Sequence, residues 1–113
     1  NERELKSMKK TAYIINVARG HIINEESLYY ALKNRTIAGA AIDTWYIYPE
    51  GKKDEPRPSK FPFWELDNLI MTPHHSGATI GTMKRRYATV AENIDRFVTK
   101  KPILNVIENI SKN

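Results

Sequence analysis

One stretch organises this chain: Leu69-Ile70-Met71-Thr72-Pro73-His74-His75-Ser76-Gly77-Ala78-Thr79. A short apolar run leads through Thr-Pro to two histidines and a turn of small residues, and a long amphipathic segment follows. An α/β protein presents a titratable side chain in this way, because a buried strand carries the chain to a loop at the strand's carboxyl end. Histidine titrates closer to neutral pH than other side chains, so it suits proton transfer. The stretch predicts an α/β fold that displays a histidine beyond a strand.

The composition is that of one small globular domain. The 113 residues are 41% hydrophobic and 27% charged, which allows a modest core and argues against disorder. There is no cysteine, so disulfides and thiolate metal sites are excluded and a cytoplasmic location fits. No apolar run is long enough to cross a bilayer, and the charged start of the chain does not resemble a secretory signal. We expect residues to precede Asn1, because the chain opens inside a predicted helix without an initiator methionine.

The net charge of +5 permits several anionic partners. The basic residues are scattered, and their densest cluster is Lys84-Arg85-Arg86. Neither an RNA-binding aromatic motif nor zinc-finger spacing accompanies this cluster, so we predict no nucleic-acid partner. The same positive charge suits an enzyme that acts on small anions.

Alternation between apolar runs and amphipathic segments predicts alternating strands and helices. The predicted elements, in chain order, are a helix over 2–9, a strand over 12–18, a helix that Asn24 caps, a strand over 38–42, a proline-rich loop over 49–62, a strand over 69–71, a helix from 80 to 97 and a final strand over 103–107. This order indicates half of a doubly wound parallel sheet.

The last predicted helix has the most regular pattern in the chain. Its apolar residues recur at alternating spacings of three and four, as on one face of a helix: Ile80, Met83, Tyr87, Val90, Ile94 and Phe97. Thr79 is expected to cap this helix, and Pro102 to end it. Because so regular a stripe normally faces a sheet, we expect core packing, with a partner-binding surface as the alternative.

Polar side chains follow three predicted strands where each strand ends: Arg19, Asp43 and His74. The carboxyl ends of parallel strands form the edge at which open α/β sheets bind ligands. Arg19 can hold a carboxylate by two parallel hydrogen bonds, His74 can move a proton, and Asp43 can orient an amide or a histidine. Each residue alone also fits an ordinary structural role, but the three together favour a functional site. His75 beside His74 raises the possibility of a metal, which we disfavour because adjacent histidines rarely chelate one ion well.

Three motifs in this order resemble the C-terminal part of the D-isomer-specific 2-hydroxyacid dehydrogenases. The motifs are Asn16-Val17-Ala18-Arg19-Gly20, Ala38-Gly39-Ala40-Ala41-Ile42-Asp43 and Thr72-Pro73-His74-His75-Ser76-Gly77. The resemblance implies the C-terminal half of a Rossmann-like doubly wound parallel sheet, ending in a long helix that returns toward the substrate domain. It assigns residues 1–101 to a partial nicotinamide-dinucleotide-binding domain and 102–113 to a return segment.

The resemblance also implies an oxidoreductase that transfers hydride between NAD or NADP and a 2-oxo acid or D-2-hydroxy acid. Arg19 would bind the carboxylate and carbonyl of the substrate, His74 would exchange a proton with the carbonyl oxygen, and Asp43 would hold the nicotinamide carboxamide. The residues implied to lie against the cofactor are Val17, Ala18, Arg19, Asp43, His74 and Gly77. A cation and a proton donor suit this reaction, because hydride transfer builds negative charge on oxygen.

Position 48 departs from the family pattern. Members usually carry a glutamate directly before the proline that follows the aspartate strand, and that glutamate pairs with the histidine and raises its pKa. Here Tyr48 precedes Pro49, and Glu50 follows two residues on. We expect Tyr48 to be the third catalytic candidate, which orients His74 and leaves it less basic than in relatives with glutamate.

The phosphate-binding motif of the family is absent. The chain contains no Gly-x-Gly-x-x-Gly, so we expect the isolated chain to bind NAD weakly and to be inactive. The resemblance implies a homodimer for the full-length protein and a small substrate such as glyoxylate, hydroxypyruvate, phosphohydroxypyruvate or a lactate-type acid, without a membrane partner. Two alternatives stay open: a dinucleotide-sensing corepressor on the same fold, and a scaffold without catalysis.

Overall fold

The computed structural model describes residues 1–51 and 57–107. The chain divides into two compact units, Asn1–Ser76 and Gly77–Asn113. The predicted boundary between residues 101 and 102 falls inside the second unit and stays a prediction. Part of the predicted loop 49–62 lies outside the described residues.

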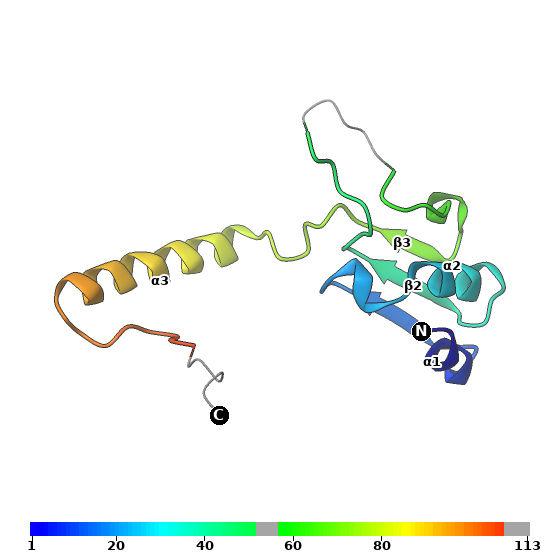
Figure 1. Cartoon of the computed structure of the whole chain (residues 1–113), viewed down its shortest axis with the longest axis horizontal. Helices are drawn as coiled ribbons and strands as arrows, with labels where there is room; N and C mark the ends of the chain where they lie inside the picture. Colours follow the sequence, from blue (N-terminus) through cyan, green and yellow to red (C-terminus); the bar gives the residue numbers. More distant parts are fainter. Residues whose placement is uncertain (52–56, 108–113) are drawn as a thin grey trace. The chain divides into compact units, whose positions relative to one another are not determined.

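The first unit is built on a three-stranded parallel sheet, shown in Figure 1. Its elements are α1 (Glu2–Ser7), β1 (Tyr13–Asn16), the 3-10 turn η1 (Gly20–Ile22), α2 (Glu25–Lys33), β2 (Gly39–Ile42), the 3-10 turn η2 (Phe63–Glu65) and β3 (Leu69–Met71). The strand order is β1-β2-β3, and both pairings are parallel. The predicted parallel α/β sheet is confirmed.

The register brings the three strand ends into one row. Asn16 of β1 pairs with Ile42 of β2, and Ile42 pairs with Met71 of β3. The residues that follow these three therefore leave the sheet at its carboxyl edge. This is the edge at which open α/β sheets bind their ligands.

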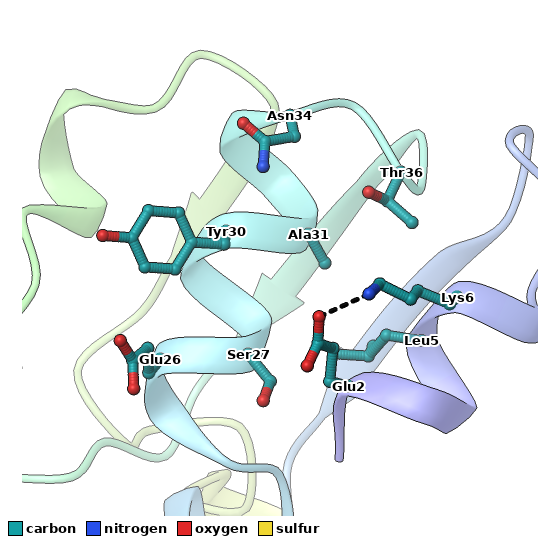
Figure 2. A pocket seen from close by; sticks show the side chains of 9 residues that line it. All are labelled: Glu2, Leu5, Lys6, Glu26, Ser27, Tyr30, Ala31, Asn34 and Thr36. Atoms are coloured by element: carbon teal, nitrogen blue, oxygen red, sulfur yellow. Dashed lines mark ion pairs between the residues drawn. The ribbon is translucent and has the colours of Figure 1, made fainter.

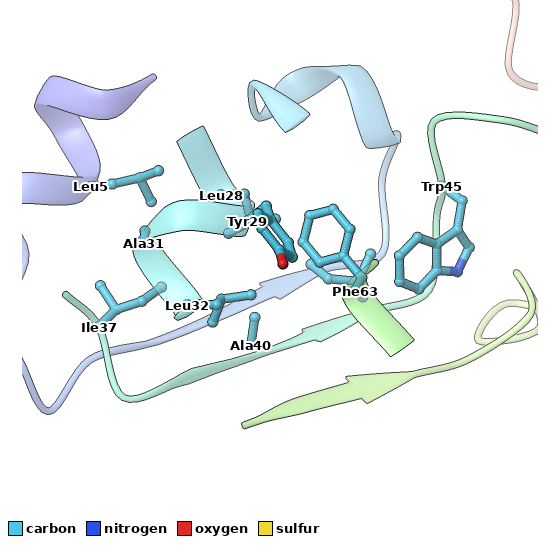
Figure 3. Close-up of a cluster of buried hydrophobic side chains, with 10 residues drawn as sticks. Leu5, Leu28, Tyr29, Ala31, Leu32, Ile37, Ala40, Trp45 and Phe63 are labelled. Carbon is cyan, nitrogen blue, oxygen red and sulfur yellow. The ribbon is translucent and has the colours of Figure 1, made fainter. Parts of the chain in front are cut away.

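Helix α2 covers one face of the sheet and builds the core. The Asn24 side chain caps the helix by accepting a hydrogen bond from the Ser27 backbone N–H at 2.9 Å, as the sequence predicts. Figure 3 shows buried side chains of α2 and η2 packed over the strands. Leu28, Leu32 and Phe63 are fully buried there. The long loop therefore returns to the body through Phe63.

The opposite face of the sheet is apolar and exposed. Tyr13 and Ile15 of β1 and Ile70 of β3 expose 72%, 74% and 67% of their surface. Alternate residues of a strand point to opposite faces, so these three mark one side. A continuously apolar strand such as that of the run over 12–18 is usually covered on both faces, but no element covers this side within residues 1–51 and 57–76.

The second unit contains α3 (Ile80–Val98), and Thr79 caps it by accepting a hydrogen bond from the Thr82 N–H at 3.1 Å. Within residues 77–107 no side chain of α3 is buried, so the predicted core role of its apolar stripe is not met there. Among the described residues, no helix is both long and apolar enough to span a membrane.

The predicted strand over 103–107 is wrong. The chain turns at Leu104 and Asn105, and Asn105 has φ of 56°. The Asn93 side chain of α3 accepts from the Leu104 N–H at 2.8 Å and donates to the Leu104 carbonyl at 3.2 Å. A side-chain amide thus takes the backbone bonds that a neighbouring strand would have to supply.

Candidate active site

The three predicted strand-exit residues lie at the carboxyl edge of the sheet. Arg19 comes three residues after Asn16, Asp43 directly follows Ile42, and His74 comes three residues after Met71. The prediction that parallel strands bring these distant residues to one edge is confirmed.

Arg19 is presented by a tight turn that Asn16 shapes. The buried Asn16 amide donates to the Arg19 carbonyl at 2.9 Å, and its oxygen accepts from the Ala18 N–H at 3.1 Å. The guanidinium of Arg19 is exposed, and its Nη1 donates to the Ala18 carbonyl at 2.6 Å. This exposed planar group has further N–H donors, which suits the binding of a carboxylate.

Gly20 lets the turn after β1 approach the chain that follows β2. A Cβ atom at position 20 would lie 2.4 Å from the Trp45 carbonyl oxygen, well inside contact distance. A residue with a side chain does not fit there without moving the backbone. The glycine thereby sets the position of Arg19 relative to the Asp43–Trp45 segment.

Asp43 fixes the loop that carries His74. Its Oδ1 accepts from the Thr72 hydroxyl at 2.6 Å and from the His75 N–H at 3.0 Å. Its Oδ2 accepts from the N–H and the hydroxyl of Ser76 at 3.0 and 2.6 Å. The side-chain hydrogen bonds from Ser76 and Thr72, followed by the two backbone bonds, hold the pKa of Asp43 well below its usual range.

These bonds span a strained residue. His74 has φ of 59°, in the left-handed region that is uncommon for residues other than glycine and asparagine. Asp43 binds Thr72 on one side of His74, and His75 with Ser76 on the other. A buried carboxylate that remains ionised therefore holds the histidine loop in a conformation that the loop alone would rarely adopt.

Tyr48 contacts the imidazole of His74 directly. The Tyr48 hydroxyl lies 3.1 Å from Nδ1 of His74 and accepts a hydrogen bond from the Trp45 N–H at 2.9 Å. The two rings are tilted by 48°, with centroids 5.6 Å apart. The hydrogen bond to the histidine thus comes from position 48, where the sequence departs from the family pattern, and not from Glu50.

Trp45 joins the segments after β2 and β3. It is 6% exposed, and its indole N–H donates to the Thr72 carbonyl at 2.9 Å. Its ring packs edge-on against Phe63 with centroids 6.0 Å apart. Trp45 is therefore buried, whereas Trp64 is 38% exposed and lies under the Arg57 guanidinium, 4.2 Å from the ring centroid.

Residues from α2 and its leading turn hold the loop that returns to η2. The Glu25 carboxylate accepts from the Ser59 hydroxyl at 2.6 Å and from the Lys60 N–H at 2.9 Å. The Tyr46 hydroxyl donates to the Ile23 carbonyl at 3.0 Å. Burial, and then the Glu25 charge, raise the pKa of Tyr46 to about 12, so Tyr46 keeps its proton and this hydrogen bond at neutral pH.

Sequence reasoning missed the residues that position the candidates. Asn16, Thr72 and Ser76 lie inside the quoted motifs, but their roles depend on partners that tertiary structure supplies. The available signal was the residue type, because asparagine, serine and threonine commonly bond nearby backbone groups in turns. The predicted cofactor contacts Val17 and Ala18 are exposed beyond β1.

A hollow of about 430 Å³ lies elsewhere, between α1 and α2 (Figure 2). Figure 2 shows the Lys6 ammonium paired with the Glu2 carboxylate beside it, at 2.6 Å. The full lining is Glu2, Leu5, Lys6, Glu26, Ser27, Tyr30, Ala31, Asn34 and Thr36. None of the strand-exit residues lines this hollow, so it is not part of the candidate site.

The family model for the D-isomer specific 2-hydroxyacid dehydrogenase, NAD binding domain, matches residues 1–76, which is more than half of the chain. The chain belongs to this family. The matched residues include Arg19, Asp43, Tyr48 and His74.

Known members of the dehydrogenase family resemble most of this chain. A glyoxylate reductase of Thermofilum pendens is 42% identical over 94 residues, which are 83% of this chain and 26% of that protein. A D-isomer specific 2-hydroxyacid dehydrogenase of Xanthobacter autotrophicus, solved with NADPH and MES, is 30% identical with a TM-score of 0.72, over 96% of this chain and 41% of that one. D-lactate dehydrogenase of Lactobacillus jensenii, solved with NAD+, shares the fold at 21% identity, with a TM-score of 0.82 over 96% of this chain and 34% of that one.

The family model describes an NAD-binding domain, and the Xanthobacter autotrophicus relative was solved with NADPH. The exposed turn of Val17 and Ala18 at the carboxyl edge fits a dinucleotide, because open α/β sheets bind such ligands there. Asp43 is different, since its two oxygens already accept four hydrogen bonds. A carboxylate has about four lone-pair sites, so binding a carboxamide would require Asp43 to release a loop donor.

Proposed function

We propose that this chain supplies the substrate anchor and the acid/base group of a site that reduces 2-oxo acids to D-2-hydroxy acids. One observation carries the proposal. At the sheet edge where Arg19 is displayed, His74 is held in a left-handed loop by Asp43 and bonded at Nδ1 by Tyr48. Nδ1 is thus occupied, which leaves Nε2 as the nitrogen available for proton exchange.

The chemistry divides between the two side chains. Arg19 pairs with the carboxylate of the oxo acid and orients its carbonyl, because the guanidinium fork matches carboxylate geometry. The bound reduced nicotinamide supplies the hydride that is received at C2. The imidazolium form of His74 donates its Nε2 proton to the carbonyl oxygen as negative charge develops there, and the neutral ring that remains, with its proton on Nδ1, takes the proton back at Nε2 in the reverse reaction.

Glyoxylate or hydroxypyruvate is the substrate class that we propose. The similarity to the glyoxylate reductase of Thermofilum pendens supports this choice. An NADPH-dependent glyoxylate/hydroxypyruvate reductase of Sinorhizobium meliloti, 26% identical with a TM-score of 0.73, supports it further. The reductant in this proposal is NADH or NADPH.

We further propose that the segment works within a larger structure. The chain spans 26% of the length of the Thermofilum pendens relative. Its sequence has no Gly-x-Gly-x-x-Gly motif, and one apolar face of its sheet is exposed. We also propose a homodimeric assembly, which the family resemblance favours. We propose a cytoplasmic location, which fits the absence of cysteine.

The test is reduction of a panel of 2-oxo acids by a polypeptide that contains this segment and a complete dinucleotide site. We expect oxidation of NADH or NADPH with glyoxylate or hydroxypyruvate. The substitution Arg19→Lys should lower kcat/KM roughly 100-fold or more, and His74→Gln should lower kcat by roughly 10² to 10⁴. Dinucleotide binding without turnover of any oxo acid would instead favour the sensing or scaffold alternative.

A further inference from the structure

We propose that Tyr48 is a positioning residue whose hydroxyl sets the tautomer of His74, donating its proton to Nδ1 so that the neutral ring carries its own proton on Nε2. The consequence for catalysis rests on the proposed reductase function. The hydrogen-bond direction itself follows from the contacts of the Tyr48 hydroxyl.

The backbone of Trp45 occupies one lone pair of the Tyr48 hydroxyl oxygen. Its N–H can only donate, and it lies 2.9 Å from the Tyr48 hydroxyl oxygen. That oxygen already accepts one hydrogen bond from Trp45, and we infer that it donates its own proton rather than accepting a second bond. Nδ1 of His74, 3.1 Å away, is the acceptor that the structure provides. A neutral imidazole that accepts at Nδ1 carries its proton at Nε2.

The Tyr48 oxygen is held by a rigid neighbour. Trp45 is buried, and its indole is bonded to the Thr72 carbonyl, two residues before His74. One buried side chain therefore fixes both the backbone donor that orients Tyr48 and the start of the loop that carries His74. The hydroxyl and the ring are placed by the same support, which is what a positioning contact requires.

The same hydroxyl also suits the protonated ring. An imidazolium has a proton on each nitrogen, so Nδ1–H must then donate. The Tyr48 oxygen has a second lone pair for it, and the hydroxyl proton can turn to water because Tyr48 is 45% exposed. A carboxylate at position 48 could only accept, so it would favour the opposite neutral tautomer, with the proton on Nδ1.

Nitrogen NMR of the ¹⁵N-labelled 113-residue chain tests the proposal without turnover. Spectra are recorded near pH 9, above the ordinary histidine pKa of about 6.5. The chain has three histidines, and His74→Gln identifies the signals of His74. We expect wild-type His74 to show the Nε2–H tautomer, Tyr48→Phe to show a mixture, and Tyr48→Glu to show mainly Nδ1–H.

Two controls separate positioning from loss of structure. Tyr87→Phe changes an exposed tyrosine of α3 in the same chemical way and should leave the His74 signals unchanged. The His21 signals and the circular dichroism spectrum should match wild type in every variant that folds. A wild-type ring with its proton on Nδ1, or a tautomer that Tyr48→Phe does not alter, overturns the proposal.

The catalytic consequence is measured separately, in the polypeptide used for the reductase test. Tyr48→Phe should lower kcat for oxo-acid reduction roughly tenfold with a smaller change in KM, because the imidazolium that donates from Nε2 loses the hydroxyl oxygen that orients its Nδ1–H. A wild-type enzyme that reduces oxo acids while His74 shows the Nδ1–H tautomer refutes the inference alone. The Nε2–H tautomer without any turnover refutes the proposed function alone.

Discussion

At the scale of single residues, the candidate site depends on the hydrogen bonds that hold its loops as well as on the side chains that those loops expose. Asp43 accepts four hydrogen bonds, and all four come from the loop around His74. The motif resemblance predicts a carboxamide ligand at this position, and that role stays a prediction. What the contacts describe is an anchor for a left-handed histidine.

The ionisation of Asp43 should make the fold sensitive to acid. Its pKa is lowered in the folded chain by the hydrogen bonds of Ser76 and Thr72. A lowered carboxyl pKa gives stability that is fully present above the unfolded pKa, about 3.9. That stability is lost as the pH falls below this value toward the folded pKa. We therefore expect the urea midpoint of the wild type to decrease as the pH is lowered from about 5 to about 2.5, an interval that brackets the unfolded pKa of about 3.9.

Asp43→Asn should remove much of this acid sensitivity while lowering the midpoint at neutral pH. Asp67→Asn is the matched control, because the Asp67 pKa is also lowered, by Arg35, but that ion pair is exposed. Exposed pairs contribute little to stability. Equal acid slopes in wild type and Asp43→Asn would show that the Asp43 contacts do not carry the effect.

The sequence predicts the chemistry-bearing residues better than the contacts that place them. Arg19 and His74 could be found because strand ends of a parallel sheet converge and because their motifs are specific. The roles of Asn16 and Ser76 could not be found, because short polar side chains choose among many nearby backbone groups. Only the folded loops select one partner for each.

At the scale of elements, patterns predicted the α-helices and strands of the first unit, with ends that differ by a few residues, but not its two 3-10 helices. The run over 12–18 forms β1 only from Tyr13 to Asn16, because the Asn16 side chain turns the chain immediately afterwards. The run over 103–107 has equally apolar residues but forms no strand. A strand needs a partner ladder, and the pattern of a single segment does not reveal whether one is present.

The close approach of the segments after β1 and β2 gives a prediction about Gly20. Gly20→Ala should be destabilising by roughly 1–3 kcal/mol, the usual cost of overpacking, because its Cβ would lie 2.4 Å from the Trp45 carbonyl oxygen. Gly77→Ala is the control, since a Cβ there meets no atom within 4 Å and φ is not positive. Urea denaturation measures both changes, and equal midpoints for the two variants would contradict the close approach.

At the scale of the whole molecule, the first unit carries the residues that we propose for one side of a dinucleotide site. The parallel sheet, the Arg19 turn and the His74 loop belong to one unit. The phosphates of a dinucleotide, however, are held in this fold by a glycine-rich turn at a helix N-terminus, and the sequence has no such motif. We therefore expect substrate chemistry and cofactor affinity to depend on different stretches of sequence.

This separation predicts how the 113-residue chain behaves with its cofactor. Titration calorimetry with NADH and with NADPH should detect no binding in the micromolar range, which would need about −8 kcal/mol. The contacts that we propose for Val17, Ala18 and Arg19 would lie at the nicotinamide end and would leave the pyrophosphate without backbone donors. A fusion that adds a Gly-x-Gly-x-x-Gly strand–turn–helix from a relative should restore micromolar affinity, and Arg19→Ala in that fusion should impair turnover of the oxo acid more than binding of the dinucleotide. Micromolar binding by the chain alone would show that its own residues hold the phosphates.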